Sequence, residues 1–203
     1  MSLHALRFTG PDGAPWAPGS PLLVHYGDTL FGTVPPPPVS RDGAEVRIQH
    51  FMPAVSPESR ELQSLRFGRV VLLETVALVA NRLPLVSAFS FVLDRDVEGY
   101  GTGVQLAASR SSLLQGIGAE HVVITPKPLA ERAGHFVVTG FWQYNAANLA
   151  ALATTLEAEW TAFSEREAAA ASGRSRHANA WLRRFLLQRA SRSAAHRKRG
   201  DDH

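Results

Sequence analysis

The chain has 203 residues, 45% of them hydrophobic and 19% charged, which suits one globular domain with a buried core. It contains no cysteine, which excludes disulfides, thiolate metal sites and a cysteine nucleophile. The first residues lack the basic and apolar segments of a secretory signal peptide, and the most apolar stretch, residues 70–80, is too short to cross a bilayer. We therefore expect a cytoplasmic protein with no membrane span.

The net charge of +3 is divided unevenly along the chain. Residues 173–203 hold nine of the 21 Lys and Arg and two of the 18 Asp and Glu, which gives +7. Residues 1–172 hold the other twelve basic and sixteen acidic residues, which gives −4. We therefore predict a single α+β domain over residues 1–172, followed by a basic C-terminal helix and tail over residues 173–203.

Short apolar runs separated by Gly, Pro and Asp predict the strands of the N-terminal half. These strands are expected at residues 3–8, 21–26, 29–34, 44–51 and 85–93. Between two of them, residues 35–38 are four prolines, which predict a stiff extended connection or, alternatively, a ligand for a proline-binding partner. Ser56, Pro57 and Glu58 are typical of a helix start. This helix is expected to reach about Arg82 and to be buried in its apolar second half.

Further helices are expected at about residues 104–115 and 146–171, and the sequence Ala-Ser-Gly-Arg-Ser at 171–175 predicts a break before a last helix at about 177–193. Because strands outnumber crossover helices and several are joined by short turns, the pattern favours an antiparallel-rich mixed sheet packed against three helices. The predicted fold class is therefore α+β, with a basic amphipathic C-terminal helix added.

Residues 120–142 contain the pattern His-x-Val-x-Thr twice, beginning at His121 and at His135. If the two segments pair as antiparallel strands, His121 lies near Thr139 and the histidines stand about 13 Å apart. Two groups that handle one proton must lie much closer. The two-histidine phosphoesterases carry His-x-Ser/Thr, whereas histidine and threonine are four residues apart here. We interpret the stretch as a structural hairpin with both histidines on the face away from the helices.

The Gly-rich segment 95–104 follows a strand and opens a helix, where backbone N–H groups can hold an anion. Its spacing, Arg95-x-x-x-Gly99-x-Gly101, resembles the Arg/Gln-x-x-Gly-x-Gly/Ala loop of GNAT-type N-acetyltransferases, with one additional residue. That resemblance implies an acyl-CoA-dependent N-acyltransferase with Gly99, Gly101 and Gly103 at the cofactor. The other interpretation is a solvated turn, because three nearby acidic residues would repel a phosphate.

Few other residues have a catalytic pattern. Glu74 stands alone in an apolar helical stretch, and we expect it to pair with a distant arginine, with a general-acid role as the alternative. The eight histidines show no His-x-His or His-x-x-x-His spacing, and no serine lies in a Gly-x-Ser-x-Gly elbow. We predict no catalytic residue, no metal and no cofactor, and we favour a protein that is not an enzyme.

The basic tail carries the leading functional hypothesis. At 100° per residue, Ala178, Trp181, Leu182, Phe185 and Leu186 form one helical stripe and most arginines lie off it. We predict that Trp181 and Phe185 anchor the helix, while the basic residues bind the backbone of RNA or DNA or an acidic protein surface. The basic residues in question are Arg183, Arg184, Arg189, Arg192, Arg197, Lys198 and Arg199.

The tail therefore predicts a non-enzymatic binding or assembly subunit. A purely structural component of a larger protein complex is the alternative that needs no ligand at all, and a C-terminal helix with a solvated charged end is the plainest interpretation of the same residues.

Overall fold

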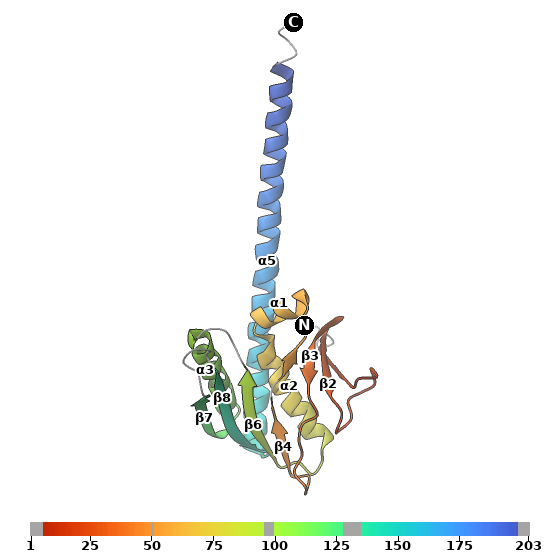
Figure 1. The fold of residues 1–203 in the computed structure, drawn as a ribbon, viewed down its shortest axis with the longest axis vertical. Coiled ribbons are helices and arrows are strands. Elements are labelled where there is room, and N and C mark those ends of the chain that lie inside the picture. Colours follow the sequence, from red (N-terminus) through yellow and green to blue (C-terminus); the bar gives the residue numbers. More distant parts are fainter. Residues whose placement is uncertain (1–5, 50, 96–99, 128–134, 199–203) are drawn as a thin grey trace. The chain divides into compact units, whose positions relative to one another are not determined.

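The computed structural model describes residues 6–49, 51–95, 100–127 and 135–198, with the backbone alone for residues 95, 100 and 173–198. The chain divides into two compact units, Met1–Thr161 and Ala162–His203, called the first and second unit below. The described residues form four helices and two four-stranded sheets (Figure 1). The α+β class expected from the sequence is confirmed.

The first sheet is antiparallel and has the strand order β1-β2-β3-β5. Its strands are β1 (Leu6–Thr9), β2 (Leu22–Tyr26), β3 (Thr29–Val34) and β5 (Met52–Pro53). Gly27, at a φ of 58°, and Asp28 make the tight turn between β2 and β3. Gly32 of β3 pairs with Pro53 of β5, and a Cβ atom at position 32 would collide with the Met52 carbonyl oxygen and the Phe51 ring. This close approach of the two strands therefore requires glycine at position 32.

The second sheet is mixed and has the strand order β4-β6-β8-β7. Its strands are β4 (Glu45–Ile48), β6 (Ala88–Arg95), β7 (Glu120–Pro126) and β8 (Phe136–Gln143). Strand β4 runs parallel to β6, and β8 pairs antiparallel with both β6 and β7. The prolines at residues 35–38 lie outside the strands, as expected, and connect β3 of the first sheet to β4 of the second.

The helix expected over residues 57–82 is two helices, α1 (Pro57–Ser64) and α2 (Phe67–Arg82). Its expected start is confirmed, because the Ser56 hydroxyl accepts a hydrogen bond from the Ser59 amide at 3.0 Å. The expected continuity is wrong. The chain turns at Arg66, which has a left-handed φ of 61°. Helix α1 is held on β3 by the buried Ser59 hydroxyl, which donates to the Phe31 carbonyl oxygen at 2.8 Å, so α2 needs a new direction to bury its own apolar residues.

Two other helices are longer than expected. Helix α3 (Tyr100–Gly116) begins four residues before the expected start and lies against β7 and β8 (Figure 1). Helix α5 (Ala146–Lys198) continues through residues 171–175, where we expected a break. Ser and Gly in a helix interior cost about 0.5 and 1 kcal/mol relative to alanine, and the run of four alanines at 168–171 favours helix on the N-terminal side. The helix expected at 177–193 is therefore part of α5.

The hairpin expected from residues 120–142 is confirmed, with a different register. Val123 pairs with Thr139, whereas we expected His121 there, and His121 occupies a β-bulge at a φ of 51°. Beyond the bulge the slip is two residues, and since side chains alternate with a period of two, Ile124 opposite Val138 keeps its expected face, whereas the bulge interrupts the alternation at His121. Trp142 is fully buried, and its indole N–H donates to the Ile117 carbonyl oxygen at the end of α3 at 2.7 Å.

Candidate functional site

A cavity of about 330 Å³ lies in the first unit, between α2 and α3 and against strands of both sheets. Its interior is mostly apolar and, besides the buried Thr75, is made by apolar side chains that are at most 6% exposed. These side chains are Phe31, Val34, Ile48, Val71, Leu93 and Leu113. The volume is at the lower end of the range for small-molecule sites, which is about 300–1,000 Å³.

Polar side chains line the same cavity where it approaches solvent. Gln105 and Thr102 are exposed residues of α3, and Arg66 is an exposed residue at the start of α2. Arg69 and Arg110 also line the cavity, and both are half-buried. Among the residues that the structure describes, the cavity lining thus includes three arginines and neither an aspartate nor a glutamate. The cavity combines an apolar interior with a cationic rim.

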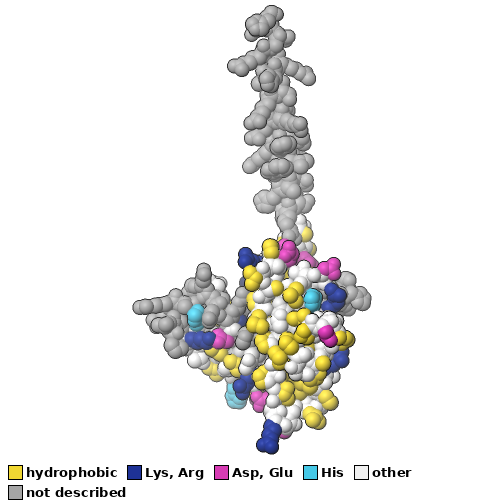
Figure 2. Space-filling model, turned by 45° about the vertical axis from the view of Figure 1, so that its right-hand side comes forward, with side chains coloured by type: hydrophobic (Ala, Val, Ile, Leu, Met, Phe, Trp, Pro, Cys, Tyr) yellow, Lys and Arg dark blue, Asp and Glu magenta, His cyan; other side chains and the backbone are white. Residues whose placement is uncertain are grey.

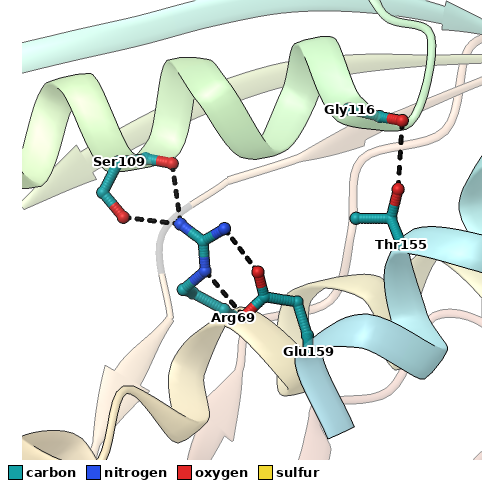
Figure 3. Close-up of polar contacts among 5 residues, drawn as sticks. All are labelled: Arg69, Ser109, Gly116, Thr155 and Glu159. Carbon is teal, nitrogen blue, oxygen red and sulfur yellow. Dashed lines mark hydrogen bonds and ion pairs between the residues drawn. The ribbon is translucent and has the colours of Figure 1, made fainter. Parts of the chain in front are cut away.

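Arg69 fixes one wall of the cavity (Figure 3). Its Nε donates to Glu159 Oε2 at 2.8 Å and its Nη2 to Glu159 Oε1 at 2.5 Å. Its Nη1 donates to the Ser109 carbonyl oxygen at 3.0 Å and to the Ser109 hydroxyl at 2.6 Å. The side chains of Arg69 and Glu159 are only 23% and 15% exposed. This two-pronged ion pair joins α2, α3 and the first part of α5.

Arg66 and Arg110 differ from Arg69 in their partners. Arg110 Nη1 donates to the Leu93 carbonyl oxygen at 3.1 Å, a neutral acceptor. Within the described ranges the Arg66 guanidinium has no hydrogen-bond or ion-pair partner. Arg66 is also the N-cap residue of α2 in the left-handed region, which costs a residue other than glycine about 1 kcal/mol or more. Arg66 is therefore a strained cation at the edge of the cavity.

The Gly-rich segment expected to hold a cofactor is largely helical. Gly101 and Gly103 lie in the first turn of α3, while Gly99 lies outside the described residues. The same helix contributes Thr102 and Gln105 to the cavity. The expected cofactor glycines therefore precede or begin a helix that forms one wall of the cavity.

The residues expected to bind a partner through the tail are mostly on α5. Its backbone is helical through Lys198, so six of the seven basic residues and both anchors, Trp181 and Phe185, stand on this helix. Arg199 lies outside the described residues, and for the others the structure gives the backbone alone. Their binding role remains a prediction.

Glu74 has a partner other than the one expected. Its Oε1 accepts a hydrogen bond from the Trp160 indole N–H at 2.8 Å, so the expected pairing with an arginine is wrong. Sequence could not identify this partner, because Trp160 is 86 residues away and neutral. A group of three or more His, Cys, Asp or Glu able to hold a metal ion is absent from the described residues. None of the described helices is both long and apolar enough to cross a membrane.

One carboxyl group has a shifted pKa. The Ser40 hydroxyl donates to Asp42 Oδ1 at 2.6 Å and the Ala44 amide donates to the same oxygen at 3.1 Å, and these bonds lower the pKa of Asp42. Asp42 belongs to the turn before β4 and does not line the cavity.

The cationic rim was missed by sequence reasoning. Arg69 had a usable signal, since it is the one charge between Phe67 and Leu73 in an otherwise apolar helical stretch. The sequence around Arg66 and Arg110 gave no such signal. Comparison of the chain with protein-family models, with curated proteins and with solved structures finds no match.

Proposed function

We propose that this chain is a binding or assembly subunit that holds the phosphate backbone of a nucleic acid with residues 173–198 of α5, called the basic segment below. The observation that carries the proposal is the continuity of α5. Eight of the nine Lys and Arg of residues 173–203 stand on one helix without interruption. A continuous helix spaces these residues along a single axis, which suits binding beside a phosphate backbone.

The dimensions support this assignment. At 1.5 Å per residue the basic segment is about 39 Å long. Duplex DNA carries one phosphate per about 1.7 Å of its axis, so a helix of this length can lie beside many phosphates and release their counterions. Binding of this kind depends on the phosphates and not on the base sequence, and it weakens steeply with salt.

The type of basic residue suits the binding of phosphate. Of the nine basic residues after Ser172, only Lys198 is a lysine. The guanidinium group stays charged and can donate two parallel hydrogen bonds to phosphate oxygens. In the first unit, by contrast, basic and acidic side chains are interspersed on the face shown in Figure 2.

The test is the affinity of the full-length chain for a fluorescently labelled DNA duplex and a labelled single-stranded RNA, measured by fluorescence anisotropy. Replacing Arg183, Arg184, Arg189 and Arg192 by Gln should lower the affinity for both at least about tenfold.

A matched control removes the same charge from the first unit. Arg41, Arg47, Arg60 and Arg82 are exposed and do not line the cavity, and replacing all four by Gln should change the affinity less than about twofold. Equal losses in the two variants would contradict the proposal. So would a wild-type chain that binds polyglutamate but neither nucleic acid, because the partner would then be an acidic protein.

A second function has one specific observation in its favour. The helix that follows the Gly-rich segment lines the cavity, so an acyl-CoA-dependent transferase could place its cofactor there. A Cβ atom at Gly101 would meet no atom within 4 Å, so Gly101→Asp introduces a negative charge without a collision. Calorimetric binding of acetyl-CoA should be lost in Gly101→Asp and retained in Gly101→Ala. Absence of binding at millimolar acetyl-CoA would exclude this function.

A further inference from the structure

The cavity of the first unit is larger than the voids that side-chain packing ordinarily leaves in a protein core. Its volume of about 330 Å³ is roughly twice the ~150 Å³ of an engineered apolar cavity that binds benzene. Atoms that line a void lose dispersion contacts on that side, and a ligand of matching shape restores them. The volume therefore suits a molecule of two fused rings.

Two phenylalanine rings form an aromatic part of the lining. Phe31 and Phe51 both line the cavity, and their ring centroids lie 4.9 Å apart at an interplanar angle of 23°, which is a stacked arrangement. Aromatic pairs are more favourable than the burial of their area alone predicts, so a third ring gains by extending this pair. Aliphatic side chains, among them Val34, Ile48 and Leu113, contribute to the buried part of the lining. This lining suits a flat aromatic ligand.

A buried hydroxyl group restricts the ligand further. Thr75 is 2% exposed, and among the buried lining residues that the structure describes it alone has a polar side chain. Its hydroxyl donates to the Val71 carbonyl oxygen at 2.7 Å, so the proton is engaged while the oxygen can still accept a hydrogen bond. A ligand with one N–H group can use this acceptor. A ligand with several polar groups, such as a purine, would find no second buried side chain to bond.

We infer that this cavity binds a bicyclic heteroaromatic ring with one N–H donor, such as indole, with the ring against Phe31 and Phe51 and the N–H on the Thr75 hydroxyl. The site lies in the first unit, so the inference does not rest on the function proposed for the basic segment. The same ring is found in free small molecules and in the tryptophan side chain of a partner protein.

Calorimetry on the full-length chain with indole and with benzothiophene tests the inference, because the two rings have nearly the same shape and only indole has an N–H donor. Thr75→Val removes the hydroxyl group and keeps the shape of the side chain. The ratio of the association constants of indole and benzothiophene should then fall about fivefold, as expected for the loss of one neutral hydrogen bond. Absence of indole binding at millimolar concentration, or an unchanged ratio in Thr75→Val, would overturn the inference.

Thr154→Val is the matched control for this change. The Thr154 hydroxyl also donates to the carbonyl oxygen four residues earlier, at 3.0 Å, but Thr154 is exposed and does not line the cavity. Its replacement should leave the ratio as it is in the wild-type chain. An equal fall of the ratio in both variants would place the ligand elsewhere and contradict the inference.

Two buried valines of α2 test whether indole occupies the cavity. Val71 lines the cavity, whereas Val79 does not. Val71→Phe directs a ring into the cavity, so it should weaken indole binding at least about tenfold without lowering the midpoint of thermal unfolding. Val79→Phe forces the same ring into packed side chains, so it should lower that midpoint, measured by circular dichroism. Wild-type indole binding by Val71→Phe, or equal losses of thermal stability in the two variants, would contradict the inference.

N-acetyltryptophanamide distinguishes the two sources of the ring, because it carries indole on a peptide unit. Tighter binding of N-acetyltryptophanamide than of indole, weakened in Thr75→Val, would support the inference with a tryptophan side chain as the ligand. Weaker binding would support it with a free small molecule as the ligand.

Discussion

Helix α2 and the basic segment of α5 have the same backbone conformation for different reasons. Seven residues of α2 are buried, and its composition alone would not keep a 16-residue helix stable in water. Its buried residues are Phe67, Val70, Val71, Leu73, Thr75, Val76 and Val79. The basic segment is rich in Ala, Arg and Leu, which favour helix intrinsically, and it carries eight basic residues. Substitutions in α2 should therefore change stability, and substitutions in the basic segment should change binding.

The largest effect is expected from Phe67→Ala. The Phe67 ring is fully buried, with ring centroids 4.8 Å from Tyr26, 5.1 Å from Phe31 and 5.9 Å from Trp160. The free energy of unfolding of the first unit, measured by urea denaturation, should fall by about 3–5 kcal/mol. Phe185→Ala in the basic segment should leave that free energy within about 0.5 kcal/mol and should weaken nucleic-acid binding. A comparable loss of stability in both variants would contradict the claim that α2 stabilises the fold and the basic segment does not.

The ion pair that fixes the cavity wall should give the next largest effect. Glu159→Gln leaves the largely buried Arg69 guanidinium without its counter-charge, so the free energy of unfolding should fall by about 2–3 kcal/mol. Glu157 is exposed and lies one half-turn earlier on the same helix, and Glu157→Gln should cost less than about 0.5 kcal/mol. Arg69→Met combined with Glu159→Leu should cost less than the sum of the single changes, as a double-mutant cycle would show. Additive losses would mean that the two side chains do not stabilise each other.

Substitution by glycine should give the smallest effects, and these should have opposite signs at Arg66 and at Arg184. Arg66→Gly removes the cost of a left-handed residue, so the free energy of unfolding should stay unchanged or rise by up to about 1 kcal/mol. Arg184→Gly lies in a helix interior, where glycine costs about 1 kcal/mol, and the helical circular dichroism signal should fall. A clear loss of stability in Arg66→Gly would show that the Arg66 side chain stabilises the fold by more than its left-handed conformation costs.

Local patterns were sufficient to predict most elements of the fold. The alternating apolar residues of β2 and β3, the Ser56 cap and the hairpin of β7 and β8 all depend on neighbours in sequence. The break at Arg66 could not be predicted from local sequence, because the hydrogen bond that holds α1 on β3 joins Ser59 and Phe31, which are 28 residues apart. The division of the strands into two sheets likewise depends on pairings between distant segments.

The candidate cavity was beyond sequence reasoning for the same reason. Arg69 and Glu159 are 90 residues apart, and Arg69 and Ser109 are 40 apart. The basic segment, by contrast, could be predicted from the high proportion of Lys and Arg in residues 173–203. The predicted break at 171–175 was wrong, because the unfavourable helix propensity of glycine and serine there is outweighed by the favourable helix propensity of the flanking residues.

The salt dependence of DNA binding tests the central claim most directly. For the wild-type chain the logarithm of the association constant should fall linearly with the logarithm of the salt concentration. Replacing Arg183, Arg184, Arg189 and Arg192 by Gln should make that slope shallower by about 3–4, because each phosphate contact contributes about 0.9. The matched replacement of Arg41, Arg47, Arg60 and Arg82 should leave the slope unchanged. A slope that shifts equally in both variants, or in neither, would contradict the assignment of phosphate binding to the basic segment.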